Sequence, residues 1–245
     1  MRPQLPPVRS LLMAALYGIG VSCAADTFCI YTAQANNAET LREQVQKIAP
    51  QLTDIAVKQL PYACQNKQDA ALQADAIAAG VSELPCLVIS DEKGAYAVLR
   101  LESLTPQAIS QATETATTPE RIQQAEQRRL NADIHLLCAN LGIGEPTDEE
   151  LAEIVKTCKT LMAHPKATTE HQQFIGYRCL YPALLLQYTR GYTGAHTPYT
   201  EAKFLEAIAA LEAARDLNRE TKIGKEAFAE RERLRAARRE ARKYE

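Results

Sequence analysis

The dipeptide Leu84-Pro85 constrains the fold of this chain most strongly, because it separates an expected helix from an expected buried strand. Before it, residues 68–79 form an alanine-rich segment that ends at Gly80, a residue suited to the C-terminal end of a helix. After it, residues 86–90 form a short apolar run that is typical of a buried strand. A proline has no N–H group to donate to a sheet, so we expect it at the start of this strand.

Strands and helices are predicted to alternate in the first half of the chain. β-branched and aromatic residues favour strands, and apolar residues at helical spacing favour helices between them. A turn rich in charged residues and glycine predicts a hairpin between the last two strands. The expected elements are, in order, strand 27–32, a helix that begins after Asn36 or Asn37, strand 54–60, helix 68–79, strand 86–90, strand 96–101 and a helix from Pro106.

This order, together with the proline at the start of the third strand, resembles a thioredoxin-like domain over residues 26–113. The resemblance implies an α/β domain with a central four-stranded mixed sheet and flanking helices. It also implies that the Leu84–Pro85 peptide bond is cis and that Pro85 faces the active-site end of the first strand. The alternative is an ordinary trans bond at the start of an edge strand.

The redox pair of such a domain is missing from this chain. Thiol–disulfide exchange needs a nucleophilic thiolate and normally a second cysteine nearby, which a Cys-x-x-Cys motif at a helix N-terminus supplies. Here Asn36 and Asn37 lie at the N-terminus of the expected helix, and the resemblance puts Ile30 where thioredoxins often have a buried acid. We therefore predict no catalytic residue, and a binding groove made by Leu84, Pro85 and the two asparagines.

The second half of the chain is predicted to be an all-α domain. Residues 114–119 are polar and end at a proline, which indicates a linker. Residues 120–224 have apolar side chains at helical spacing, with Pro182 expected to kink or divide one helix. Residues 225–245 contain eight basic and five acidic side chains and little apolar surface, so we expect a charged helical tail, solvated or frayed.

The N-terminus, residues 1–25, has the pattern of a secretory signal peptide, with basic Arg2 and Arg9, a short apolar run and small residues. The run is shorter than the roughly 20 residues of a membrane-spanning helix, and nothing after it is long and apolar enough. We therefore expect a secreted or periplasmic protein. The alternative is a lipoprotein anchored at Cys23.

Charge and motifs exclude several classes of function. The signal segment holds two of the 28 basic residues and none of the 30 acidic ones, which leaves a formal net charge of about −4. That balance argues against nucleic-acid binding, which needs a basic face. No nucleotide or phosphate motif is present, so no cofactor is predicted. His135, Cys138, Cys158 and His164 match no familiar zinc spacing, and no metal is predicted.

Six cysteines remain after the signal segment, and an even number in an exported chain favours disulfide bonds. Three lie in each half, so a complete pairing requires at least one bridge between the halves. The alternatives are that some thiols stay free, or that all six pack as small buried residues. The disulfide candidates are Cys29, Cys64, Cys86, Cys138, Cys158 and Cys179.

Tyrosine and arginine side chains gather in one stretch of the helical half. This mixture favours interfaces, because both residue types combine contact area with hydrogen-bonding ends, although helix packing is the simpler explanation. The predicted interface residues are Tyr177, Arg178, Tyr181, Tyr188 and Tyr192.

We therefore expect an exported, non-catalytic binding or scaffold protein with a thioredoxin-like domain, a helical interaction domain and a protein or peptide partner. The alternative is a divergent thiol–disulfide oxidoreductase that uses Cys64 or Cys86 without the Cys-x-x-Cys motif. Both cysteines are expected near the Pro85 end of the sheet, but a fold alone does not establish an activity.

Overall fold

A computed structural model describes residues 26–91, 94–114, 118–192 and 197–241. The predicted signal segment, Cys23 and residues 115–117 of the predicted linker lie outside the described residues. The chain divides into two compact units between Asp133 and Ile134.

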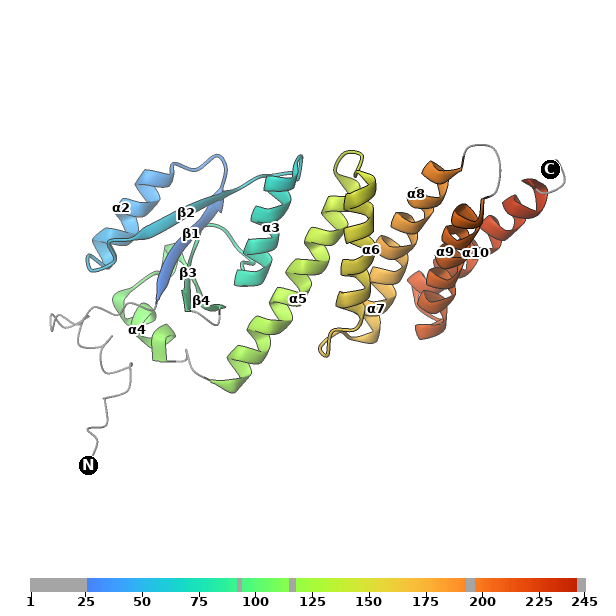
Figure 1. Cartoon of the computed structure of the whole chain (residues 1–245). Coiled ribbons are helices and arrows are strands. Elements are labelled where there is room, and N and C mark those ends of the chain that lie inside the picture. The colour runs from blue at the N-terminus through green and yellow to red at the C-terminus, as the bar shows by residue number, and fades with distance from the viewer. Residues whose placement is uncertain (1–25, 92–93, 115–117, 193–196, 242–245) are drawn as a thin grey trace, which may run out of the picture. The chain divides into compact units, whose positions relative to one another are not determined.

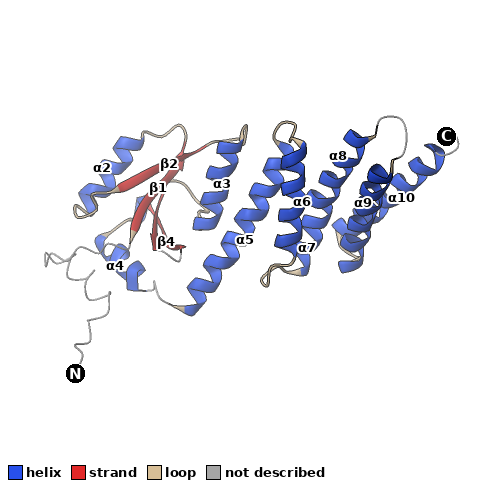
Figure 2. Cartoon of the chain, viewed as in Figure 1, coloured by secondary structure: helices blue, strands red, loops and turns tan. Residues whose placement is uncertain are grey.

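The first unit contains a four-stranded mixed sheet with the strand order β2-β1-β3-β4 (Figures 1 and 2). Its strands are β1 (Thr27–Ala33), β2 (Ile55–Leu60), β3 (Cys86–Asp91) and β4 (Gly94–Arg100). β1 is parallel to β2 and antiparallel to β3, and β3 is antiparallel to β4. The predicted mixed sheet, with a parallel crossover followed by a hairpin, is confirmed.

Local sequence signals determine where the helices around this sheet begin and end. The elements are α2 (Ala38–Ile48), α3 (Lys67–Ala79), the short 3-10 helix η1 (Leu101–Ser103) and α4 (Pro106–Glu114). The side chains of Asn37 and Asn66 cap α2 and α3 by accepting hydrogen bonds from backbone N–H groups of the first turn. α3 ends at Gly80, whose φ of 79° is in the left-handed region that glycine favours.

Each face of the sheet buries its own core, because successive side chains of a strand point to opposite faces. On one face, Ile30, Leu87 and Ile89 are fully buried in a cluster that includes residues of α2 and α4. On the other face, Tyr31 and Cys86 pack against alanines of α3. The sheet is therefore covered on both faces.

Helix α5 (Pro119–Gly142) begins in the first unit and ends in the second. Arg121 donates two hydrogen bonds to the Asp91 carboxylate, at 3.0 and 2.9 Å. Arg128 donates to the backbone carbonyl of Ala95 at 2.7 Å. These contacts explain why the first half of α5 belongs with the sheet.

The second unit is helical (Figure 2). Its elements beyond the end of α5 are α6 (Asp148–Met162), α7 (Thr169–Ile175), the π-helical turn η2 (Gly176–Leu180), α8 (Tyr181–Gly191), α9 (Pro198–Leu217) and α10 (Lys222–Ala241). Capping boxes at Thr147, Thr168 and Thr197 begin α6, α7 and α9. Among the described residues, no helix combines the length and the apolar character that a membrane span requires.

Pro182 lies in the first turn of α8, directly after the π-turn η2, which interrupts the regular helix where a kink or division was expected. A proline at this position cannot donate the helical hydrogen bond, and its ring would clash with the carbonyl of Arg178, four residues earlier. The backbone N–H of Tyr181 instead donates to the carbonyl of Gly176, five residues earlier. The extra residue of the π-turn is the local solution to the proline clash.

The predicted charged tail forms most of α10, which packs on α9 where we expected a solvated segment. Arg231 and Arg235 both pair with Glu212 of α9, at 3.3 and 2.7 Å. Ala227 is fully buried, so the helices approach closely there. Ion pairs and small residues hold α10 in place of the apolar stripe that the sequence lacks.

Candidate functional site at the Pro85 end of the sheet

One end of each of the four strands lies at the end of the sheet beside Pro85, where Arg100, the last residue of β4, pairs with Cys86. β1 and β2 are parallel and both end there, whereas β3 is antiparallel to β1 and begins there. Tyr31 pairs with Cys86, which puts Pro85 beside Thr32 near the end of β1. The Leu84–Pro85 peptide bond is cis, as the thioredoxin-like resemblance implies.

The two asparagines of the predicted groove are fixed by hydrogen bonds. Asn36 Nδ2 donates to Oγ1 of the buried Thr32 at 2.7 Å. Gln59 Nε2, on β2, donates to the backbone carbonyl of Asn36 at 2.8 Å. Asn37 caps α2. Where the resemblance would put a pair of reactive sulfur atoms, this chain has amides that stabilise the loop between β1 and α2.

Two large side chains with apolar surface are exposed at this end of the sheet. Leu84 is 40% exposed and Tyr62 is 79% exposed. Among the described residues of the first unit, one other large hydrophobic side chain is exposed, that of Val98 in β4. The sequence analysis did not single out Tyr62. Its position two residues after β2, the parallel neighbour of β1, was the signal that could have found it.

The loop that carries Leu84 is held against the end of β4. Glu83 forms an ion pair with Arg100, the last residue of β4. The backbone N–H of Leu101 donates to the carbonyl of Pro85 at 3.3 Å. The Leu84 side chain is therefore presented from a loop with fixed neighbours on both sides, which reduces the conformational entropy lost on binding.

The two alternative catalytic cysteines have different surroundings. Cys86 is 1% exposed on the α3 face of the sheet, and burial raises the pKa of its thiol to about 11. The Cys64 side chain is half-buried, with Sγ 3.8 Å from the carbonyl oxygen of Asn66. Since the thiolate is the reactive form, burial keeps Cys86 in its inert, protonated form at neutral pH.

Alkylation of the native chain is expected to distinguish these two thiols. Iodoacetamide at pH 8 should modify Cys64 at least tenfold faster than Cys86, as measured by mass spectrometry of proteolytic peptides. The Cys86 pKa is raised from 9.0, so its rate should keep rising about tenfold per pH unit toward pH 11. The stability gained by burying the neutral thiol is complete below pH 9 and is lost as the pH rises through 11. Equal rates at pH 8 in the native chain would contradict this account, whereas in urea the rates should converge.

The disulfide candidates are distributed over both units, and no two described cysteines lie at bonding distance. Burial raises the pKa of Cys29, in β1, to about 11. In the helical unit, the Sγ atoms of Cys138 and Cys179 are 2.7 Å apart, and Cys158 is fully buried. A bridge between the halves stays a prediction. Among the described residues, no group of three or more His, Cys, Asp or Glu side chains is placed to hold a metal ion.

Two of the five predicted interface residues contribute to packing between helices. Tyr181 is 7% exposed and donates to Glu230 Oε1 of α10 at 2.5 Å. The Tyr188 ring contacts the Phe204 ring of α9 edge-on, with centroids 5.4 Å apart. Packing of α8 against α9 and α10 therefore accounts for both tyrosines.

The remaining members of that set are Tyr177, Arg178 and Tyr192. The Arg178 side chain is half exposed, lies over the Tyr177 ring at 4.9 Å and pairs with Glu226 at 3.1 Å. Tyr192 lies at the end of α8, its ring centroid 5.9 Å from that of Tyr188. An interface role for these residues stays a prediction.

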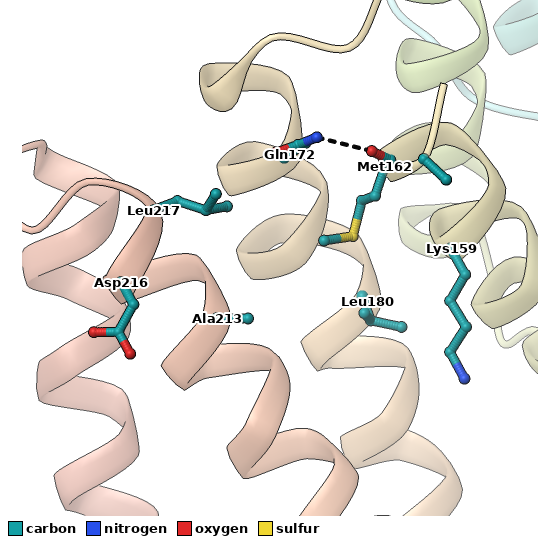
Figure 3. A pocket seen from close by; sticks show the side chains of 8 residues that line it. Lys159, Met162, Gln172, Leu180, Ala213, Asp216 and Leu217 are labelled. Atoms are coloured by element: carbon teal, nitrogen blue, oxygen red, sulfur yellow. Dashed lines mark hydrogen bonds between the residues drawn. The ribbon is translucent and has the colours of Figure 1, made fainter. Parts of the chain in front are cut away.

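The helical unit also has an open hollow of about 630 Å³ (Figure 3). Met162, Leu180 and Leu217 give it a mainly apolar lining, and Lys159 and Asp216 lie at its sides (Figure 3). Hydrogen bonds from Arg215 and Arg219 lower the pKa of Asp216. This hollow was not predictable from the sequence, because α6, α7, η2 and α9 all contribute to its lining.

Comparison with protein-family models, with curated proteins and with solved structures gives no match for this chain. Its candidate site therefore rests on the geometry of its own residues.

Proposed function

We propose that the first unit is a thioredoxin-like domain that has no redox pair and binds an extended segment of a protein partner at its Pro85 end. The observation that supports this proposal is that the Leu84 and Tyr62 side chains are both exposed at this end of the sheet. The neighbouring loop between β1 and α2 is held by hydrogen bonds from Asn36 to Thr32 and from Gln59 to the backbone carbonyl of Asn36. Exposed apolar groups next to a fixed framework are what a binding surface needs.

The same site supports binding better than thiol chemistry. Of the two candidate cysteines, Cys86 is buried with a raised pKa, and Asn36 and Asn37 occupy the loop where the resemblance would put the sulfur pair. A tyrosine and a leucine instead offer contact area, and tyrosine is enriched where binding energy concentrates. We propose that the protein is exported and that its helical unit is a second interaction or assembly surface.

The proposal is tested with a permanently unfolded polypeptide whose cysteines are carboxymethylated, so that it can bind but cannot exchange disulfides. Fluorescence anisotropy with the full chain should show saturable binding. Leu84→Asp and Tyr62→Ala should each raise the dissociation constant about tenfold or more, as expected for residues at the centre of an interface.

Val98→Thr is the matched control, because Val98 is also exposed but lies within β4 and its replacement has nearly the same shape. Its dissociation constant should stay within about twofold of the unmodified chain. An equal rise in the dissociation constant for all three variants, or no rise for Leu84→Asp and Tyr62→Ala, would contradict the proposed site. Reduction of insulin that Cys64→Ser abolishes would support the oxidoreductase alternative instead.

A further inference from the structure

The helical unit contains a second arrangement of sulfur atoms, independent of the Pro85 site. Cys138 lies in the last turns of α5, and Cys179 lies in the π-turn η2, 41 residues further along the chain. Their Sγ atoms are 2.7 Å apart. Both residues belong to the second unit, so this contact lies within one compact body.

The separation of the two sulfur atoms is close to that of a bond. A disulfide has an S–S length of about 2.05 Å, so a movement of less than an ångström closes the pair. The π-turn at Pro182 contributes to this placement, because it rotates Cys179 relative to a regular helix.

The two thiols are not equivalent. Cys138 is partly exposed, and the hydrogen bond from Cys179, together with the charge of Arg178, lowers its pKa. Cys179 is fully buried, and its contact with Cys138 and its burial raise its pKa. This is the asymmetry of an attacking thiol and a resolving thiol.

We propose that Cys138 and Cys179 are a dithiol pair that a disulfide-bonded oxidant, such as the disulfide of a small thiol, converts to an intramolecular disulfide. The Cys138 thiolate attacks one sulfur of the oxidant, its S–S bond breaks, and one thiolate leaves. Cys179 then loses its proton, attacks Sγ of Cys138 in the mixed disulfide and releases the second thiolate. The two cysteines are oxidised by two electrons, and the oxidant is reduced to two thiols.

The bond would close the loop that includes α6, α7 and the chain between them. Closing a loop of this length restricts the unfolded chain, so oxidation should raise the midpoint of thermal unfolding of the helical unit by roughly 5–15 °C. Burial raises the pKa of the Cys158 thiol, and the charge of the nearby Cys138 raises it further. Cys158 is therefore the thiol that could compete with Cys179 for Cys138, and it serves as the control.

The test treats the full chain with glutathione disulfide, alkylates the remaining thiols and identifies linked tryptic peptides by mass spectrometry. Cleavage after arginine and lysine puts Cys138, Cys158 and Cys179 on separate peptides, 130–156, 157–159 and 179–190. We expect a reductant-sensitive link between peptides 130–156 and 179–190, and a matching fall in the unfolding midpoint when reductant is added.

Three cysteine variants distinguish the proposed disulfide from one that involves Cys158. Cys158→Ala should keep both the link and the thermal shift, whereas Cys138→Ser and Cys179→Ala should each abolish both. A link that forms to peptide 157–159 instead, or full alkylation of Cys138 and Cys179 after oxidant treatment of the folded chain, would overturn the proposal. None of these outcomes depends on whether the Pro85 end binds a polypeptide.

Discussion

Replacing Arg121 with methionine is expected to lower the free energy of unfolding of the first unit by about 3–5 kcal/mol, because it removes an ion pair and two hydrogen bonds from the largely buried Asp91 carboxylate. The Arg121 and Asp91 side chains are 8% and 18% exposed and share two hydrogen bonds. Arg121 also donates to the carbonyl of Gly94 at 2.7 Å and lies over the Tyr96 ring at 4.6 Å. Urea unfolding followed by circular dichroism measures the loss.

Arg100→Met is the matched control for this prediction. Arg100 pairs with Glu83, but their side chains are 63% and 53% exposed, and exposed pairs contribute only about 0–1 kcal/mol. A comparable loss in both variants would mean that burial does not set the strength of these pairs. A loss below about 1 kcal/mol for Arg121→Met would mean that α5 is not anchored to the sheet in the way described.

Leu87→Ala is expected to cost about 2–5 kcal/mol, because it removes buried methyl groups and leaves a cavity in the core on the α2 face of the sheet. Leu87 is 0% exposed and pairs with Leu99 of β4. The measurement is the free energy of unfolding in urea.

Leu84→Ala controls for this change with the same substitution three residues earlier. Leu84 is 40% exposed, so its truncation should cost about 1 kcal/mol or less. It should, however, weaken binding of the carboxymethylated polypeptide, as measured by anisotropy. A larger loss of stability for Leu84→Ala than for Leu87→Ala would contradict the assignment of Leu87 to the core and of Leu84 to the exposed surface.

Local chemistry made much of the fold predictable. Asn37 and Gly80 act on the helix ends within a few residues of themselves. The sequence therefore placed the end of α3 at Gly80 and restricted the start of α2 to Asn36 or Asn37. The apolar run after Pro85 predicts a buried strand at the position observed. The mixed sheet followed from the resemblance to a thioredoxin-like domain, which uses the order of these same elements.

Features that depend on contacts between distant segments were not predictable in this way. Arg121 and Arg128 are ordinary helix residues in the sequence, and their role requires the hairpin of β3 and β4 to lie beside α5. Tyr62 is brought to the Pro85 end of the sheet by the parallel pairing of β2 with β1, which puts both strand ends at the same edge. The contact of Cys138 with Cys179 depends on the register of α5 against a π-turn, which no helical periodicity describes.

The central claim is that the Pro85 end binds a polypeptide without using sulfur. The most direct test is the dissociation constant of the carboxymethylated polypeptide for the double variant Cys64→Ser, Cys86→Ala, with circular dichroism confirming that the variant is folded. We predict a value within about twofold of the unmodified chain, because Leu84 and Tyr62 are unchanged. A rise to the level of Leu84→Asp would contradict the claim and assign binding to the thiols.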